Sequence, residues 1–129
     1  MLPDPRDVAV TAVYDHLLIR LVDLPAALSA RGYGYAGSLV LEVTDDACPW
    51  NTGRWRLDSG LDGATCRRAT SFEPTDLTMD VSALGSLYLG GVAPGPLAAA
   101  GRLRGTPQAL LRAAALFATP TPPWCSIGF

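Results

Sequence analysis

Lysine is absent from this sequence, and histidine occurs only once, at His16. A single histidine excludes metal sites built from several imidazole ligands. The three cysteines, Cys48, Cys66 and Cys125, are odd in number and lack the CxxC spacing of zinc and redox motifs. They favour reduced thiols in a cytoplasmic protein, with one bridge and one leftover thiol as the alternative. We therefore expect no metal site.

The sequence also lacks an excess of positive charge and a long apolar run. Its 10 arginines are outnumbered by 12 acidic residues, and a net charge of −2 argues against nucleic acid as a partner. The apolar stretches stop well short of the roughly 18 residues that a membrane-spanning helix needs. The sequence also lacks the pattern of a signal peptide, which is a charged segment followed by an apolar segment and a cleavage site of small residues. We therefore expect neither a membrane span nor a secretory signal.

What the sequence does contain is enough apolar material for one packed domain. Of its 129 residues, 49% are hydrophobic and 17% are charged, a composition that argues against disorder. We find no internal repeat and no linker. The whole chain, 1–129, is therefore expected to form a single domain.

Alternating patterns predict strands in the first two thirds of the chain. They are expected at residues 17–22, 37–46, 54–58, 63–70 and 77–81. In the second of these, Leu39, Leu41 and Val43 share one face, and in the third Trp55 and Leu57 point inward. Consecutive hairpins of this kind favour an antiparallel sheet.

Helix signals separate and follow these strands. Helices are expected at residues 24–31, 81–89, 94–102 and from 107 towards Pro120. Asp23 and Thr106 are N-cap residues for the first and last of them. The last helix is expected to bury Leu110, Ala113, Ala114 and Phe117. Helices gathered on one face of an antiparallel sheet make an α+β fold.

One glycine-rich stretch, "RGYGYAG" at residues 31–37, matches two phosphate-binding patterns. It satisfies GxGxxG and also the [RQ]xxGx[GA] loop that holds the acetyl-CoA pyrophosphate in GNAT acetyltransferases. Both loops follow a strand and open a helix, whose N–H groups bind the phosphates. Here a helix ends at Arg31 and a strand begins near Ser38. The stretch is therefore predicted to be a helix-to-strand connector.

Other polar candidates have simpler interpretations. His16 would have to serve any Ser–His–Asp triad, but no GxSxG motif is present. Asp45 and Asp46 could suggest metal or acid–base chemistry, yet adjacent strand residues point to opposite faces, which favours a strand-end turn. Arg67 and Arg68 are interpreted as a solvated patch.

The chain closes on "PPWCSIGF", an apolar stretch without a charged side chain. Trp124, Ile127 and Phe129 could dock this tail on its own domain and seal the core. Alternatively, the stiffened tail could carry its terminal carboxylate, with an ordinary pKa near 3.5, into a place covered by a partner. The tryptophans could also line a cavity for an apolar ligand, although core packing is the simpler interpretation.

Four blocks of the sequence resemble a known domain. They are "YDHLLIRLVDLPAALSARGY", "LVLEVTDDACPWNTGRWRLD", "LTMDVSALGSLYLGG" and "PPWCSIGF", in that order over nearly the whole chain. Together they resemble the C-terminal domain of the enhanced-intracellular-survival (Eis) type of GNAT N-acetyltransferases. The resemblance implies a sterol-carrier-protein-like fold: a curved antiparallel sheet of about five strands with helices packed on one face.

The resemblance also implies a role for the tail. Full-length members have two GNAT-type domains, use acetyl-CoA to acetylate amines, and commonly assemble as hexamers. In them the final carboxylate reaches the active site, and the matching position here is Phe129. Trp124 and Ile127 would anchor the tail against the substrate site. The chain itself is expected to hold no cofactor, because its only loop match fails on context.

Three functions remain open at this point. The first is an accessory domain that completes a GNAT active site through its C-terminus, with the acetyltransferase domains in cis or in trans. The second is a stand-alone sterol-carrier-like protein that binds a lipid or another apolar small molecule. The third is a structural module for homo-oligomer assembly. An open apolar cavity of several hundred Å³ under the helices would favour the carrier.

Overall fold

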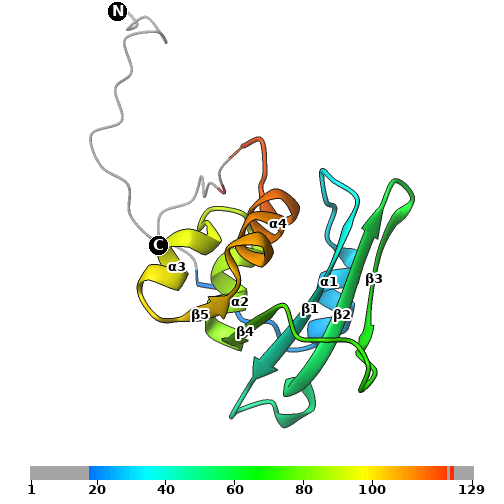
Figure 1. The fold of residues 1–129 in the computed structure, drawn as a ribbon, viewed down its shortest axis with the longest axis vertical. Helices are drawn as coiled ribbons and strands as arrows, with labels where there is room; N and C mark the ends of the chain where they lie inside the picture. The colour runs from blue at the N-terminus through cyan, green and yellow to red at the C-terminus, as the bar shows by residue number, and fades with distance from the viewer. Residues whose placement is uncertain (1–17, 122, 124–129) are drawn as a thin grey trace, which may run out of the picture.

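The computed structural model describes residues 18–121 and residue 123 (Figure 1). Within these residues, the elements in chain order are α1 (Leu24–Ala30), β1 (Gly37–Thr44), the 3-10 turn η2 (Pro49–Asn51), β2 (Gly53–Gly60), β3 (Gly63–Arg68), β4 (Leu77–Asp80), α2 (Val81–Tyr88), α3 (Pro94–Ala99), β5 (Leu103–Gly105) and α4 (Pro107–Phe117). This arrangement of one sheet with helices packed against it confirms the α+β fold.

The five strands form one open sheet in the order β3-β2-β1-β4-β5. The neighbouring pairs are antiparallel except for β1 and β4, which run parallel, so the sheet is mixed where a wholly antiparallel sheet was expected. The reason is the connection after β3. Residues 69–76 cross over β2 and β1 before β4 begins (Figure 1). Because of this crossover, β4 runs in the same direction as β1, its neighbour in the sheet.

The strand expected at residues 17–22 is wrong for the part that the structure describes. Residues 18–22 lie outside the sheet, and the carbonyls of Leu21 and Val22 accept hydrogen bonds from Asn51 Nδ2 at 3.3 and 3.0 Å. The fifth strand is instead β5, Leu103–Gly105, which pairs with β4. Its three residues are too few to show an alternating pattern in the sequence.

The inward face of the sheet follows the expected alternation. Leu39, Leu41 and Val43 of β1 are fully buried. On β2, Leu57 is fully buried and Trp55 is only 6% exposed. These side chains form one hydrophobic cluster with buried residues from all four α-helices. The sheet and helices therefore share a single core.

The helix caps also form as predicted. Asp23 Oδ1 accepts the Ala26 N–H at 3.1 Å, and Thr106 Oγ1 accepts the Ala109 N–H at the same distance.

None of the described helices has the length and apolar character needed to cross a membrane.

The buried stripe of α4 differs slightly from the prediction. Ala113 and Phe117 are buried as expected, whereas Leu110 and Ala114 are only partly buried. Ala109 and Leu116 complete the buried face instead. The buried stripe therefore differs from the predicted one at two of its four positions, and the side chain of Leu116 lies beside Gly37 at the start of β1.

Candidate functional site

The residues to which the sequence assigned a function lie at the end of the chain. Trp124, Ile127 and Phe129 are outside the described residues, and so is His16. The structure does describe the segment that leads to the tail, from the end of α4 at Phe117 through Thr121, and then Pro123. The candidate site is therefore built from the residues that hold this segment.

A pair of glycines after α2 lies directly against the segment. A Cβ atom at Gly90 would come within 2.6 Å of Thr119 Cγ2 and 2.8 Å of the Phe117 carbonyl oxygen. A Cβ atom at Gly91 would come within 2.7 Å of Pro123 Cγ. Gly90 also has a φ of +78°, a left-handed conformation that glycine adopts without strain. Two adjacent residues without side chains thus let the C-terminal segment pack closely on the α2–α3 connection.

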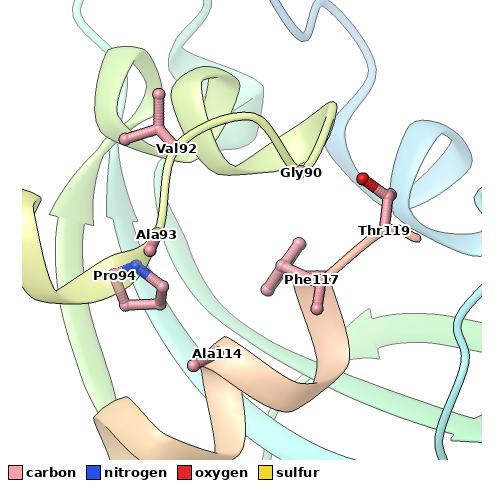
Figure 2. A pocket seen from close by; sticks show the side chains of 8 residues that line it. Gly90, Val92, Ala93, Pro94, Ala114, Phe117 and Thr119 are labelled. Atoms are coloured by element: carbon pink, nitrogen blue, oxygen red, sulfur yellow. The ribbon is translucent and has the colours of Figure 1, made fainter. Parts of the chain in front are cut away.

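A shallow pocket of about 130 Å³ opens beside this contact. Figure 2 shows Gly90, Phe117 and Thr119 on one side of it and Val92, Ala93 and Pro94 on the other. Its lining is apolar apart from backbone groups and the Thr119 hydroxyl. The pocket is smaller than the roughly 300–1,000 Å³ of typical small-molecule sites.

The stretch at residues 31–37 is a helix-to-strand connector, as predicted. It joins the end of α1 to the start of β1, so the stretch does not open a helix. The Arg31 guanidinium is turned inward and donates to the carbonyls of Tyr88 and Phe117 at 2.7 and 2.8 Å. The arginine of this stretch therefore already has backbone carbonyl partners.

Asp45 is part of a buried network and not an exposed turn residue. Its carboxylate accepts hydrogen bonds from Asn51 Nδ2 at 3.0 Å and from the Cys48 N–H at 3.0 Å, and it also pairs with Arg20. Burial acts to raise the pKa of Asp45, but these hydrogen bonds and the Arg20 charge outweigh it and lower the pKa below its ordinary value. Sequence reasoning placed Asp45 at a strand end but missed Asn51.

The arginines of β3 are more engaged than a solvated patch. Arg68 stacks on the ring of Trp55, with its Cζ 3.9 Å from the ring centroid, and it donates to the Trp50 carbonyl at 2.7 Å. Arg67 forms an ion pair with Glu73 at 2.8 Å. Trp55 is a core residue, whereas Trp50 is 58% exposed, so the two tryptophans do not line a common cavity.

Comparison with known proteins identifies the fold family. A family model described as "Sterol carrier protein domain" matches residues 24–126. The chain belongs to this family. The match covers the whole sheet and all the described helices, including the segment that leads to the tail.

The relatives of this sterol carrier protein domain are longer acetyltransferases. It is 47% identical over 116 residues to an uncharacterised N-acetyltransferase of Streptomyces avermitilis, covering 89% of this chain and 28% of the relative. It is 41% identical over 119 residues to the N-acetyltransferase Eis of Mycobacterium tuberculosis, covering 87% of this chain and 27% of the relative. The chain thus spans less than a third of the length of these relatives and corresponds to one portion of them.

Solved structures agree with this assignment. Eis1 from Mycobacterium abscessus superposes with a TM-score of 0.81 and 39% identity, over 100% of this chain and 32% of that protein. A GCN5-related N-acetyltransferase from Anabaena variabilis superposes with a TM-score of 0.73 and 34% identity, over 80% of this chain and 26% of that protein. The domain therefore has the fold of the sterol-carrier-like portion of Eis-type acetyltransferases.

Proposed function

We propose that this domain is the accessory part of an Eis-like GNAT N-acetyltransferase and that it places its C-terminal carboxylate in the acetyltransferase active site. The observation that carries the proposal is the match of this chain to one portion of longer N-acetyltransferases. The donor, acetyl-CoA, would be bound by the acetyltransferase domains, in the same polypeptide or as a partner chain.

Among the described residues, the packing under the helices favours this proposal over a lipid carrier. Leu28, Leu57, Leu84 and Leu87 are all fully buried and belong to the one hydrophobic cluster shared by the sheet and the helices. The pocket beside α4, at about 130 Å³, is too small for a sterol or a fatty acyl chain.

The chemistry assigns the terminal carboxylate a specific task. A carboxylate beside a cationic amine can accept its proton and hold the resulting nucleophile in place for attack on the acetyl group. Shielding from water would raise the pKa of the carboxylate towards a range useful for a base. The base would be the backbone carboxylate of Phe129, so the identity of that side chain matters less than the position of the chain end.

The other tail residues have supporting tasks in this proposal. Trp124 and Ile127 would anchor the tail to the acetyltransferase domain and contact the substrate amine's apolar part. We also propose that the assembled enzyme is a cytoplasmic homo-oligomer. Light scattering of the complete enzyme measures that oligomeric state directly.

The test uses the complete acetyltransferase, meaning this domain with its acetyltransferase domains in one polypeptide or as co-expressed chains. One alanine is added after Phe129, which moves the carboxylate by one residue. We expect kcat for amine acetylation to fall by about 100-fold or more, with an unchanged melting temperature. The matched control is Phe129→Leu, which keeps the carboxylate in place and should retain most of the activity.

Two results would contradict the proposal. The first is an extended enzyme that turns over as fast as the unmodified one. The second is an equal loss of kcat in the extended enzyme and in Phe129→Leu, which would assign the effect to the aromatic side chain and not to the carboxylate.

A further inference from the structure

Arg31 connects three helices at the point where the C-terminal segment begins. It follows the last residue of α1, and its Nε donates to the carbonyl of Tyr88, the last residue of α2, at 2.7 Å. Its Nη2 and Nη1 donate to the carbonyls of Phe117 and Leu116, at the end of α4, at 2.8 and 3.3 Å. One guanidinium therefore holds the C-terminal ends of α2 and α4 together.

Two aromatic rings fix the orientation of this guanidinium. Arg31 Cζ lies 4.8 Å from the ring centroid of Tyr33 and 5.2 Å from that of Phe117. The two rings meet edge to face, with centroids 6.0 Å apart. Cation–π contacts add to hydrogen bonds with helix C-terminal carbonyls, which favour a cation. The planar, multidentate guanidinium suits this position in a way that a lysine ammonium does not.

The chain that leaves α4 also lies close to the glycine pair. A Cβ atom at Gly90 or Gly91 would clash with Thr119, two residues beyond the helix, or with Pro123, the last described residue. The described part of the segment is therefore held by Arg31 at Phe117 and lies close to the glycines at Thr119 and Pro123. From Pro123, the six remaining residues can span at most about 20 Å to Phe129.

We infer that Arg31 is a positioning residue that sets where the C-terminal tail starts and hence where its carboxylate can reach. This inference rests on the proposed function. Arg31 would not contact the reacting atoms and would act only through α4 and the segment after it. A tail that starts about 1 Å from its proper place would present the carboxylate with the wrong geometry, and misplacements of that size lower catalytic rates substantially.

The experiment measures steady-state acetylation by the complete acetyltransferase with Arg31→Lys and Arg31→Ala, well below the melting temperature of each variant. We expect kcat per folded enzyme to fall roughly tenfold in Arg31→Lys and further in Arg31→Ala, with KM for acetyl-CoA unchanged. Guanidinium ion at millimolar concentration should restore part of kcat in Arg31→Ala, because the space among the carbonyls and rings remains. Arg31→Lys keeps the test valid if Arg31→Ala does not fold.

The matched control is Arg102→Ala, which removes an exposed arginine whose Nη2 donates to Ser82 Oγ at 2.9 Å. It should leave kcat unchanged. A purely structural role for Arg31 predicts a lower melting temperature with normal kcat per folded enzyme, and that result would overturn the inference. If the alanine added after Phe129 still lowers kcat in that case, the proposed function stands and only the inference about Arg31 is overturned. An unchanged kcat in both the Arg31 variants and the extended enzyme would overturn both.

Discussion

Asn51 donates a hydrogen bond from Nδ2 to Asp45 Oδ2 over 3.0 Å, and both residues are buried. The same amide accepts the Leu24 N–H through Oδ1 at 3.0 Å and donates to the Val22 carbonyl at 3.0 Å. One side chain thus joins the end of β1 to the start of α1 and to the segment before it. This is why residues 18–22 run beside η2 instead of adding a strand to the sheet.

Replacing Asn51 should therefore weaken the whole domain. Asn51→Ala removes these hydrogen bonds and leaves buried partners unsatisfied, so we expect the free energy of unfolding to fall by roughly 2–4 kcal/mol. Urea denaturation followed by tryptophan fluorescence measures the change. Ser86→Ala is the control, because it removes only an exposed hydroxyl that donates to the Ser82 carbonyl. Equal stability of the two variants would contradict the prediction.

Asp45 should make stability depend on pH in the acidic range. Its pKa is lowered in the folded state, because hydrogen bonds from Asn51 and the Cys48 N–H and the charge of Arg20 outweigh the effect of burial. Its contribution is therefore complete above the unfolded pKa of about 4 and is lost as the pH falls below that value. We expect the urea midpoint of Asp45→Asn to vary less between about pH 5 and pH 2 than that of the unmodified domain. Parallel pH profiles would show that Asp45 does not carry this dependence.

Cys66 should be unreactive while the domain is folded. Burial, with a smaller contribution from Asp58, raises the pKa of its thiol to about 12. At pH 8 a much smaller fraction of Cys66 is thiolate in the folded domain than in the unfolded chain, and the thiolate is the form that reacts with iodoacetamide. We therefore expect alkylation of Cys66 in the folded domain to be at least about 100-fold slower than in 8 M urea. Mass spectrometry of a Cys48→Ser, Cys125→Ser variant follows this single thiol. Alkylation at the rate of the unfolded protein would refute the prediction.

Glu73 should hold the crossover segment, residues 69–76, on the outer face of the sheet. Its carboxylate pairs with Arg67 and Arg56 at 2.8 and 3.1 Å and accepts the Thr70 N–H at 2.6 Å. In Glu73→Gln we expect faster amide hydrogen exchange in residues 69–76 and little change in the core strands. The control is Glu42→Gln, which alters an exposed carboxylate on the same face that contacts Thr75 Oγ1 only at 3.5 Å. Equal exchange in the two variants would contradict the prediction.

Much of the fold could be predicted from local patterns. The alternation of Leu39, Leu41 and Val43 identified the inward face of β1, and the caps Asp23 and Thr106 marked the starts of α1 and α4. These signals depend on residues close together in the chain, and local sequence therefore suffices to read them.

The wrong predictions have a common physical cause: the features concerned depend on contacts between residues far apart in the sequence. The apolar stretch at residues 17–22 resembles a strand, but the hydrogen bonds of Asn51, some 30 residues away, hold part of it outside the sheet. The parallel pairing of β1 and β4 depends on where the crossover ends. The role of Arg31 depends on Phe117, which is 86 residues away. No local signal in the sequence could indicate these partners of Arg31.

The close approach of the C-terminal segment predicts a sharp difference between two glycines. Gly90→Ala places a Cβ within 2.6 Å of Thr119 and forces a side chain into a φ of +78°, so we expect a loss of roughly 1–3 kcal/mol in the free energy of unfolding. Gly95→Ala is the matched control, because Gly95 has no positive φ and no atom lies within 4 Å of its Cβ position. It should be neutral or stabilise the domain by up to about 1 kcal/mol. Thermal and urea unfolding of both variants measure the difference. If Gly90→Ala were as stable as Gly95→Ala, the segment after α4 would not pack against the α2–α3 connection, and the path proposed for the tail would be wrong.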